Sequence, residues 1–364
     1  MKRTIRYITL SAAVLALAVS CGKKQESSSA PEIPQSAPVA VASRSASEPA
    51  KAPDPAPGPE PVVQEESAPV AETRTRLFDD LFQAAREAAD AGEIEVLLSN
   101  GASLSARGPH GVTPLMMAAQ YNKNAQVVQA LVGDVLHAKD ERGMHALAYA
   151  ARYNPTVGAL AVLLAGATQD EKDTALLLAS QYNTDEVVKA LLASGANAQA
   201  RTRRGTKALY VAASENQDPN VVKLLLSGSQ NELDTALFYA ASGNCPEVVK
   251  ELLDAGAFVN QTDRMGATAL MYAARYNQNP EVLRTLVSAG ADVNQVSLFG
   301  ENALSFAAEN GNTAMAQALI EEGADINSIQ VNGRPVVLYA VESKLDNDIL
   351  AYVLDHGAEV KAPD

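Results

Sequence analysis

The chain has 364 residues and a formal net charge of −14, with 29 Lys and Arg against 43 Asp and Glu. Without Lys2, Arg3 and Arg6 at its start, the balance is 26 basic against 43 acidic residues, or −17. A folded domain this acidic is not expected to bind nucleic acid or to dock on anionic lipid.

The first 20 residues have the pattern of an export signal. Three basic residues precede an apolar stretch, residues 8–19, that is too short to span a membrane. The sequence AVSC that ends at Cys21 resembles the bacterial lipobox, although that pattern prefers Leu where this chain has Ala18. The resemblance implies that Cys21 is lipidated and anchors the protein, with Gly22 favouring the outer membrane and a periplasmic orientation. Cleavage after Ala18 is the alternative, and it would release a soluble periplasmic protein.

The next segment has the composition of a disordered tether. Residues 22–74 hold ten of the 18 prolines, with Ala, Ser and Glu between them and no apolar periodicity. Such a segment spans about 40 Å as a random coil and about 160 Å as an extended polyproline helix. The predicted organisation is a signal peptide over 1–20, a tether over 21–74 and a folded domain over 75–364.

The folded part repeats one unit, which is most complete in residues 266–300. Its TALMYAA stretch places apolar and small residues on one helical face. Asn277 follows where the chain must turn, and we expect it in the left-handed conformation that Asn tolerates. Pro280 suits the first turn of a second helix, and Gly290 suits its end. The second helix is expected to bury Val282, Leu283, Leu286 and Val287.

The unit recurs about nine times along the chain. The leucine of its T-A-L motif, replaced by valine in the last copy, returns every 28 to 34 residues, at Leu81, Leu115, Leu147, Leu176, Leu209, Leu237, Leu270, Leu304 and Val337. One such unit cannot bury its apolar face alone, so the copies must stack on one another.

The motifs of the unit resemble ankyrin repeats. Thr113-Pro114-Leu115-Met116 follows the T-P-L-H of that family, and the sequence from Ala289 to Asn294 follows its A-G-A-D-V-N. The resemblance covers residues 75–364 and implies an all-α ankyrin-repeat solenoid of about nine stacked helix-turn-helix repeats with short β-hairpin fingers. It also implies a rigid surface for a protein partner.

Three copies depart from the pattern. After Leu164 the chain reaches the next copy through AGATQDEKD, and after Leu226 through SGSQNEL. Both stretches lack the A-D-V-N excursion that forms a finger, so we expect truncated fingers in copies three and five. The first copy, 77–107, carries additional charge and is predicted to be an end cap.

The finger tips are predicted to be exposed, and two of them have a distinctive composition. One concentrates positive charge in Arg201, Arg203, Arg204 and Lys207. Another exposes the apolar pair Leu298 and Phe299. We interpret Arg203, Arg204 and Phe299 as partner-binding residues. The alternatives are a solvated tip and a phenylalanine folded back against its neighbour.

Four copies end their first helix in a Tyr-Asn pair, at Tyr121, Tyr153, Tyr182 and Tyr276. In ankyrin repeats this helix end points into the concave groove. We therefore expect the first three tyrosines to form a ladder next to Arg152, with Tyr276 isolated from it. Tyr and Arg are the residue types that most often dominate binding energy. The alternative is that the tyrosines only cover a longer turn.

No motif for catalysis or metal binding is present. The chain lacks HExxH, a CxxC pair and a Gly-rich phosphate loop, and His137 and His145 lack further ligands. We predict no enzyme activity, no cofactor, no metal and no small-molecule substrate. The predicted function is a membrane-tethered scaffold for protein–protein interaction in the bacterial cell envelope. The alternative is a structural spacer or assembly factor without a specific groove ligand.

Overall fold

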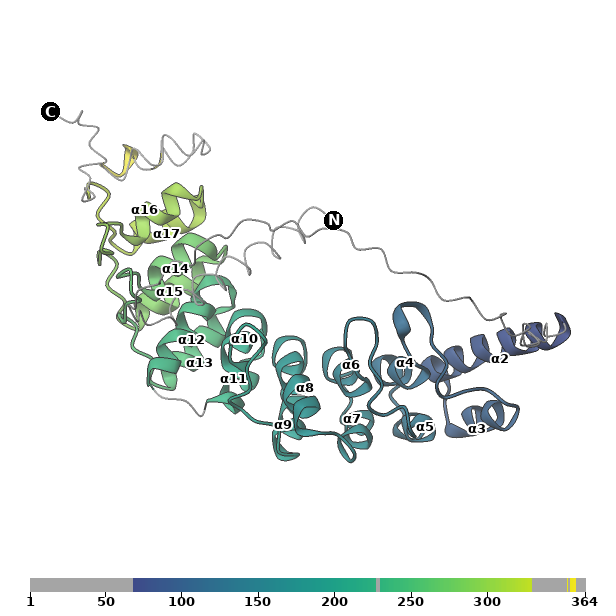
Figure 1. The fold of residues 1–364 in the computed structure, drawn as a ribbon. Helices are drawn as coiled ribbons and strands as arrows, with labels where there is room; N and C mark the ends of the chain where they lie inside the picture. Colours follow the sequence, from purple (N-terminus) through teal and green to yellow (C-terminus); the bar gives the residue numbers. More distant parts are fainter. Residues whose placement is uncertain (1–67, 227–229, 329–351, 353, 358–364) are drawn as a thin grey trace, which may run out of the picture.

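The computed structural model describes residues 68–226, 230–328, 352 and 354–357. The described residues contain 16 α-helices, α2 to α17, and one short 3-10 helix, η2 (Pro109–Gly111). Successive helices pair into copies 1 to 8, each with an inner and an outer helix (Figure 1). The predicted ninth copy, around Val337, lies outside the described residues.

The inner helices are α2 (Ala68–Glu87), α4 (Pro114–Tyr121), α6 (Ala146–Tyr153), α8 (Gln169–Tyr182), α10 (Ala208–Glu215), α12 (Gln230–Gly243), α14 (Ala269–Tyr276) and α16 (Ala303–Glu309). The outer helices are α3 (Ala91–Ser99), α5 (Ala125–Leu131), α7 (Val157–Leu164), α9 (Asp185–Ala193), α11 (Pro219–Leu225), α13 (Pro246–Asp254), α15 (Pro280–Ser288) and α17 (Thr313–Glu321). The pairs follow an arc, with the inner helices on its concave side (Figure 1). The predicted all-α repeat solenoid is confirmed.

The fingers, which connect each outer helix to the next inner helix, are turns with little β structure. Within the described residues only two isolated antiparallel bridges occur, Arg201 with Lys207 and Thr262 with Thr268. Neighbouring tips also bond directly, since the Leu298 N–H donates to the Met265 carbonyl at 2.9 Å. The fingers therefore depend on adjacent copies more than on strand pairing of their own.

Helix α2 begins earlier than the boundary that the sequence predicted between the tether and the folded domain. Helix α2 begins at Ala68, so residues 68–74, assigned above to the tether, are helical. Residues 1–67, including Cys21, lie outside the described part. Helix α2 packs on α4 and also contacts α3 and α5, and among the described residues no inner helix precedes it, which agrees with an end cap.

Copy 7 shows why these residues form paired helices. Thr268 caps α14 by accepting the Met271 N–H at 3.3 Å, and Pro280 starts α15 where no N–H is needed. Gly290 ends α15 with a φ of 92°, which a residue with a side chain rarely adopts. The predicted core residues Val282, Leu283 and Leu286 are fully buried, whereas Val287 is only partly buried.

The asparagine that follows the inner helices from α4 onward does not adopt the left-handed conformation expected for Asn277. That residue is extended, with φ −82° and ψ 147°. Its amide instead donates to the Ala241 and Asn244 carbonyls of the preceding copy, both at 3.0 Å. Six more buried asparagines make the same kind of bond to the preceding copy, namely Asn122, Asn154, Asn183, Asn216, Asn244 and Asn312. We call these seven residues the asparagine ladder; it satisfies helix-end carbonyls that would otherwise be buried without a donor.

The connections after copies 3 and 5 are short, as predicted, because α8 begins at Gln169 soon after Leu164 and α12 begins at Gln230 soon after Leu225; residues 227–229 of the second connection lie outside the described residues. The inner helices that follow these connections are longer. Helices α8 and α12 have 14 residues, against eight in α6 and α14. The Gln169 amide donates to the Gly195 carbonyl at 3.0 Å, and the Asp173 carboxylate accepts the Asn197 N–H at 2.8 Å. The equivalent bonds in copy 6 join Gln230 to Gly256 and Asp234 to Phe258. We call each Gln–Asp pair a clasp; it joins the start of an inner helix to the end of its outer helix.

Candidate functional site

The three tyrosines of the predicted ladder lie at the ends of α4, α6 and α8. Each precedes an asparagine of the asparagine ladder, whose buried amide fixes the direction of the helix end. The tyrosine before it consequently faces solvent. The exposed fractions of Tyr121, Tyr153 and Tyr182 are 46%, 44% and 48%.

Arginine side chains lie against these tyrosine rings. The guanidinium of Arg152 lies 5.2 Å from the ring centre of Tyr153 and 4.4 Å from that of Tyr182 in the next copy. Arg86 of the end cap lies 4.7 Å from the ring of Tyr121. Such contacts stabilise by about 0.5–2 kcal/mol each, depending on desolvation. The structure thus brings Arg152, Tyr153 and Tyr182 together through cation–π contacts, whereas Tyr121, the third tyrosine of the predicted ladder, lies against Arg86 instead.

Tyr276 is separated from this group by copies 5 and 6, as predicted, but it has a similar neighbourhood. The Arg275 guanidinium lies 5.4 Å from the Tyr276 ring and 5.1 Å from the ring of Phe306 in copy 8. Neither Arg275 nor Phe306 was predicted from sequence to be a site residue. The signal was available in the repeated Ala-Ala-Arg-Tyr-Asn sequence.

A second feature missed from sequence ties two fingers to their inner helices. The Tyr149 hydroxyl donates to the Asp140 carboxylate at 2.8 Å, and Tyr272 donates to Asp263 at the same distance. Burial, followed by this bond to Asp140, raises the pKa of Tyr149 to about 12. The signal was an Asp nine residues before a Tyr in both copies.

The predicted basic finger is only partly as expected. Arg201, Arg203 and Arg204 are exposed, but Lys207 is buried and forms an ion pair with Glu232 of α12. Lys207 therefore contributes no charge to the surface. The reason is that the finger of copy 5 is truncated, so the longer helix α12 brings Glu232 to the start of α10.

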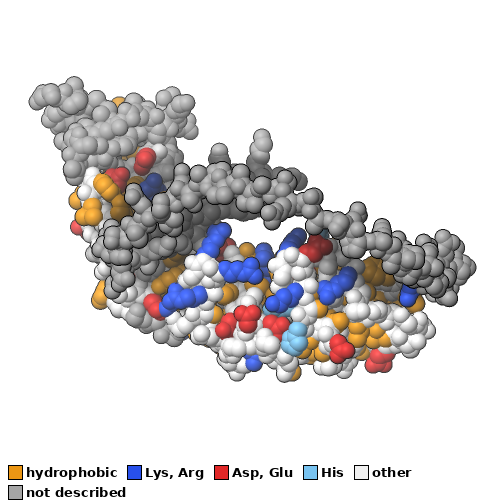
Figure 2. Space-filling view, in the orientation of Figure 1, with side chains coloured by type: hydrophobic (Ala, Val, Ile, Leu, Met, Phe, Trp, Pro, Cys, Tyr) orange, Lys and Arg blue, Asp and Glu red, His pale blue; other side chains and the backbone are white. Residues whose placement is uncertain are grey.

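Charge is separated between the fingers and the outer helices. Without the buried Lys207, the finger segments 107–111, 139–144, 199–207 and 262–267 hold seven exposed Lys and Arg against three Asp and Glu. The eight outer helices hold nine Asp and Glu against four Lys and Arg. Figure 2 shows basic side chains gathered along the concave edge over the middle of the stack. An acidic chain thus presents a locally basic face, which net charge alone did not indicate.

The apolar finger tip is exposed. Leu298 is 71% and Phe299 55% exposed, and Met265 on the neighbouring finger is also exposed. The backbone bond from Leu298 to Met265 holds the two tips together. Phe299 is therefore not folded into the core, and its role in partner binding stays a prediction.

The remaining candidate groups are structural. His145 caps α6 by accepting the Ala148 N–H, and His137 bonds to Glu171 at 3.1 Å. In residues 68–226 and 230–328 no three His, Cys, Asp or Glu side chains come together in a way that could hold a metal ion. Cys245 is a free, partly buried thiol before α13, and burial raises its pKa.

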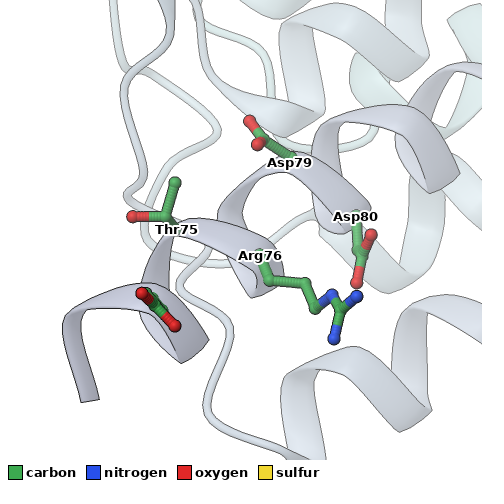
Figure 3. Close-up of a pocket in the computed structure, with 5 residues that line it drawn as sticks. Thr75, Arg76, Asp79 and Asp80 are labelled. Carbon is green, nitrogen blue, oxygen red and sulfur yellow. The ribbon is translucent and has the colours of Figure 1, made fainter. Parts of the chain in front are cut away.

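Helix α2 carries a shallow depression lined by Glu72, Thr75, Arg76, Asp79 and Asp80 (Figure 3). All five side chains are exposed and come from one helix, and Figure 3 shows those of Arg76 and Asp80 extending toward one another. This depression lacks the enclosed apolar character of a small-molecule site.

Within the described part of the chain, none of the helices combines the length and the apolar character needed to cross a bilayer.

Comparisons with known proteins agree with the architecture. The family model described as "Ankyrin repeats (3 copies)" matches residues 81–169, 155–234, 213–297 and 276–364. Neurogenic locus notch homolog protein 1 of Xenopus laevis is 30% identical over 193 residues, or 51% of this chain and 7% of that protein. Ankyrin repeat and KH domain-containing protein CBG24701 of Caenorhabditis briggsae is 34% identical over 190 residues, or 50% of this chain and 6% of that protein. The matched segments thus span a small part of these relatives.

Proposed function

The chain belongs to the ankyrin-repeat family, whose repeats are protein-interaction scaffolds, and we propose that its concave face binds a protein partner in the bacterial cell envelope. The binding residues are Tyr121, Tyr153, Tyr182 and Arg152 at the inner-helix ends, with Arg203, Arg204 and Phe299 on the fingers. The partner is a protein with an acidic segment. No catalytic step is part of this function.

One observation carries the proposal: half-exposed tyrosine rings held by arginine on the concave side of a rigid stack. A tyrosine ring offers a large contact area and loses little entropy when it is fixed, and here the neighbouring guanidinium already restricts it. The basic fingers beside it would attract an acidic segment and speed association. A spacer without a specific ligand has no need for such a surface.

The envelope location rests on the sequence before the repeats. The AVSC sequence ending at Cys21 supports lipid attachment there, and Gly22 favours the outer membrane on the periplasmic side. A soluble periplasmic form, produced by cleavage after Ala18, is the alternative. In Cys21→Ser we expect loss of palmitate labelling and release from, or incomplete processing at, the membrane. Identical fractionation of both forms, with no label in either, would rule out the anchor.

Site-specific photo-crosslinking tests the binding face. A photoreactive residue at Tyr153 should capture a discrete protein from envelope fractions, whereas one at Lys189 on outer helix α9 should not. With the purified partner, Tyr153→Ala should weaken binding by about 2 kcal/mol or more if the ring is an anchor. Arg203→Glu with Arg204→Glu should mainly slow association and reduce its salt dependence.

Folding provides the control, because each variant must keep the wild-type melting curve. If Tyr153→Ala lowers stability and leaves binding unchanged, the tyrosines cover turns and do not bind. Equal crosslinking from Tyr153 and Lys189 would favour the spacer or assembly role instead.

A further inference from the structure

Two inner helices four copies apart have nearly the same sequence. Helix α6 reads ALAYAARY and α14 reads ALMYAARY, and each is followed by an asparagine of the asparagine ladder. Each contributes one arginine to the concave face, Arg152 and Arg275. The three copies between them lack an arginine at this position, where they have Gln181, Ser214 and Ser242.

The surroundings of the two arginines also match. Each guanidinium lies over the tyrosine of its own copy and over an aromatic ring of the next copy, Tyr182 for Arg152 and Phe306 for Arg275. The four distances to the ring centres lie between 4.4 and 5.4 Å. The aromatic rings therefore fix both cations in a similar place.

The same two copies also share the bond that ties a finger to an inner helix. Tyr149 before Arg152 donates to Asp140, and Tyr272 before Arg275 donates to Asp263. Each carboxylate further accepts two backbone N–H groups of its own finger. We call the two aromatic rings and the Tyr–Asp bond of each site an arginine cradle; copies 3 and 7 each form one.

Neither arginine has an acidic partner among the described residues. No carboxylate oxygen lies within 4.0 Å of either guanidinium there, and both Nε atoms are buried without an acceptor. Arg284 on outer helix α15 differs, because it pairs with Glu281 and Glu321. A guanidinium held by aromatic rings and lacking a carboxylate keeps its outer N–H groups for a ligand. Carboxylates match that geometry well.

We propose that Arg152 and Arg275 are two equivalent carboxylate-binding points that together hold one extended protein segment with two acidic positions. The inference rests on the proposed function, because it identifies the partner chemistry of the same concave face. Glu215 between the two points repels carboxylates there, so the acidic positions are separate and do not form a continuous run. The overall acidity of the chain disfavours a nucleic-acid ligand.

The repeat geometry predicts the spacing of the two acidic positions. Packed helices lie about 8–10 Å apart, so four copies separate the points by about 32–40 Å. An extended chain advances about 3.3 Å per residue, which corresponds to about 10–12 residues. A segment with acidic residues at that interval can reach both arginines at once, and the second contact then gains from its high effective concentration.

Defined peptides test this spacing. Fluorescent Gly/Ser peptides would carry one Asp-Glu pair, or two pairs about 5, about 11 or about 17 residues apart, and their binding to the full chain would be measured at low ionic strength. We expect the middle spacing to bind about tenfold or more tightly than the single pair. Arg152→Gln or Arg275→Gln should each remove that gain, while Lys189→Gln on α9 should not.

The possible outcomes distinguish a failure of this inference from a failure of the proposed function. Two outcomes would overturn the proposal of two equivalent carboxylate-binding points. One is an affinity that does not depend on the spacing of the acidic pairs. The other is an affinity that neither arginine variant changes, although both variants keep the wild-type melting curve. If binding is then lost only in the Arg203→Glu and Arg204→Glu variant, the concave face still binds its partner through the basic finger. If crosslinking from Tyr153 also fails, the proposed function fails with it.

Discussion

Copies 6 and 7 differ in how they join their neighbours, although their cores are alike. Copy 7 is entered through a finger, and the Asn260 side chain bonds both to the Gly290 carbonyl and to the Asp292 N–H. Copy 6 is entered through a longer helix, and Gln230 and Asp234 make the equivalent two bonds. A single asparagine and a two-residue clasp thus satisfy the same backbone groups. Both copies thus form the same two hydrogen bonds, although different residues supply them.

The buried leucines provide the strongest test of the shared core. Leu252 in copy 6 and Leu286 in copy 7 are both fully buried. We expect Leu252→Ala and Leu286→Ala to lower the free energy of unfolding by about 2–5 kcal/mol each in urea titrations. Hydrogen exchange in Leu252→Ala should accelerate first in copies 5 to 7, and uniform acceleration over the stack would contradict nearest-neighbour coupling.

The asparagine ladder should also be equivalent in the two copies. Asn244→Ala would leave the Ala213 and Asn216 carbonyls, now at 2.8 Å from its amide, without a buried donor. We expect a loss of about 1–3 kcal/mol, because unpaired buried groups keep their desolvation cost. Asn277→Ala should cost a similar amount, and a clear difference in urea midpoints would show that the ladder is not uniform.

Removal of the clasp in copy 6 should lower stability more than removal of the equivalent asparagine in copy 7. Asp234 is buried and accepts from both Gln230 and Phe258, whereas Asn260 is exposed. Asp234→Ala should therefore lower stability by about 1–2 kcal/mol, and Asn260→Ala by less, because water replaces the lost bonds at an exposed site. Equal thermal shifts in the two variants would remove the distinction between clasp and finger.

A smaller, pH-dependent effect should distinguish the cap of copy 3 from that of copy 7. Burial lowers the pKa of His145; Lys139 and His137 act in the same direction, and Glu171 and Asp170 oppose them. As pH falls below about 6.5, the unfolded chain takes up a proton that the folded chain resists, so stability falls. Protonation of Nδ1 would also prevent it from accepting the Ala148 N–H.

The matched variant is His145→Thr, since Thr268 fills this position in copy 7. We expect the loss of stability between pH 7.5 and 5.5 to shrink by up to about 1 kcal/mol in His145→Thr, the usual value of one cap. The two proteins share every other residue, so the difference between them isolates His145. An unchanged pH dependence of the urea midpoint would show that the cap stays neutral or is unimportant.

The sequence by itself determined the repeat architecture. Helix periodicity, caps such as Thr268, and Gly290 at a helix end act within about ten residues, so they can be read locally. The same patterns placed Tyr121, Tyr153 and Tyr182 at exposed helix ends and predicted the two truncated fingers.

Only the tertiary structure decided which side chains meet between copies. Lys207 reads as part of a basic finger, yet it is buried against Glu232, which lies 25 residues later. Asn277 reads as a turn residue, yet its amide bonds to carbonyls 33 and 36 residues earlier. Stacking brings together residues about one repeat apart, and the partner of each then depends on finger length and helix phase in the neighbouring copy. The surface charge and the two arginine cradles follow from that stacking, because each combines side chains from two copies.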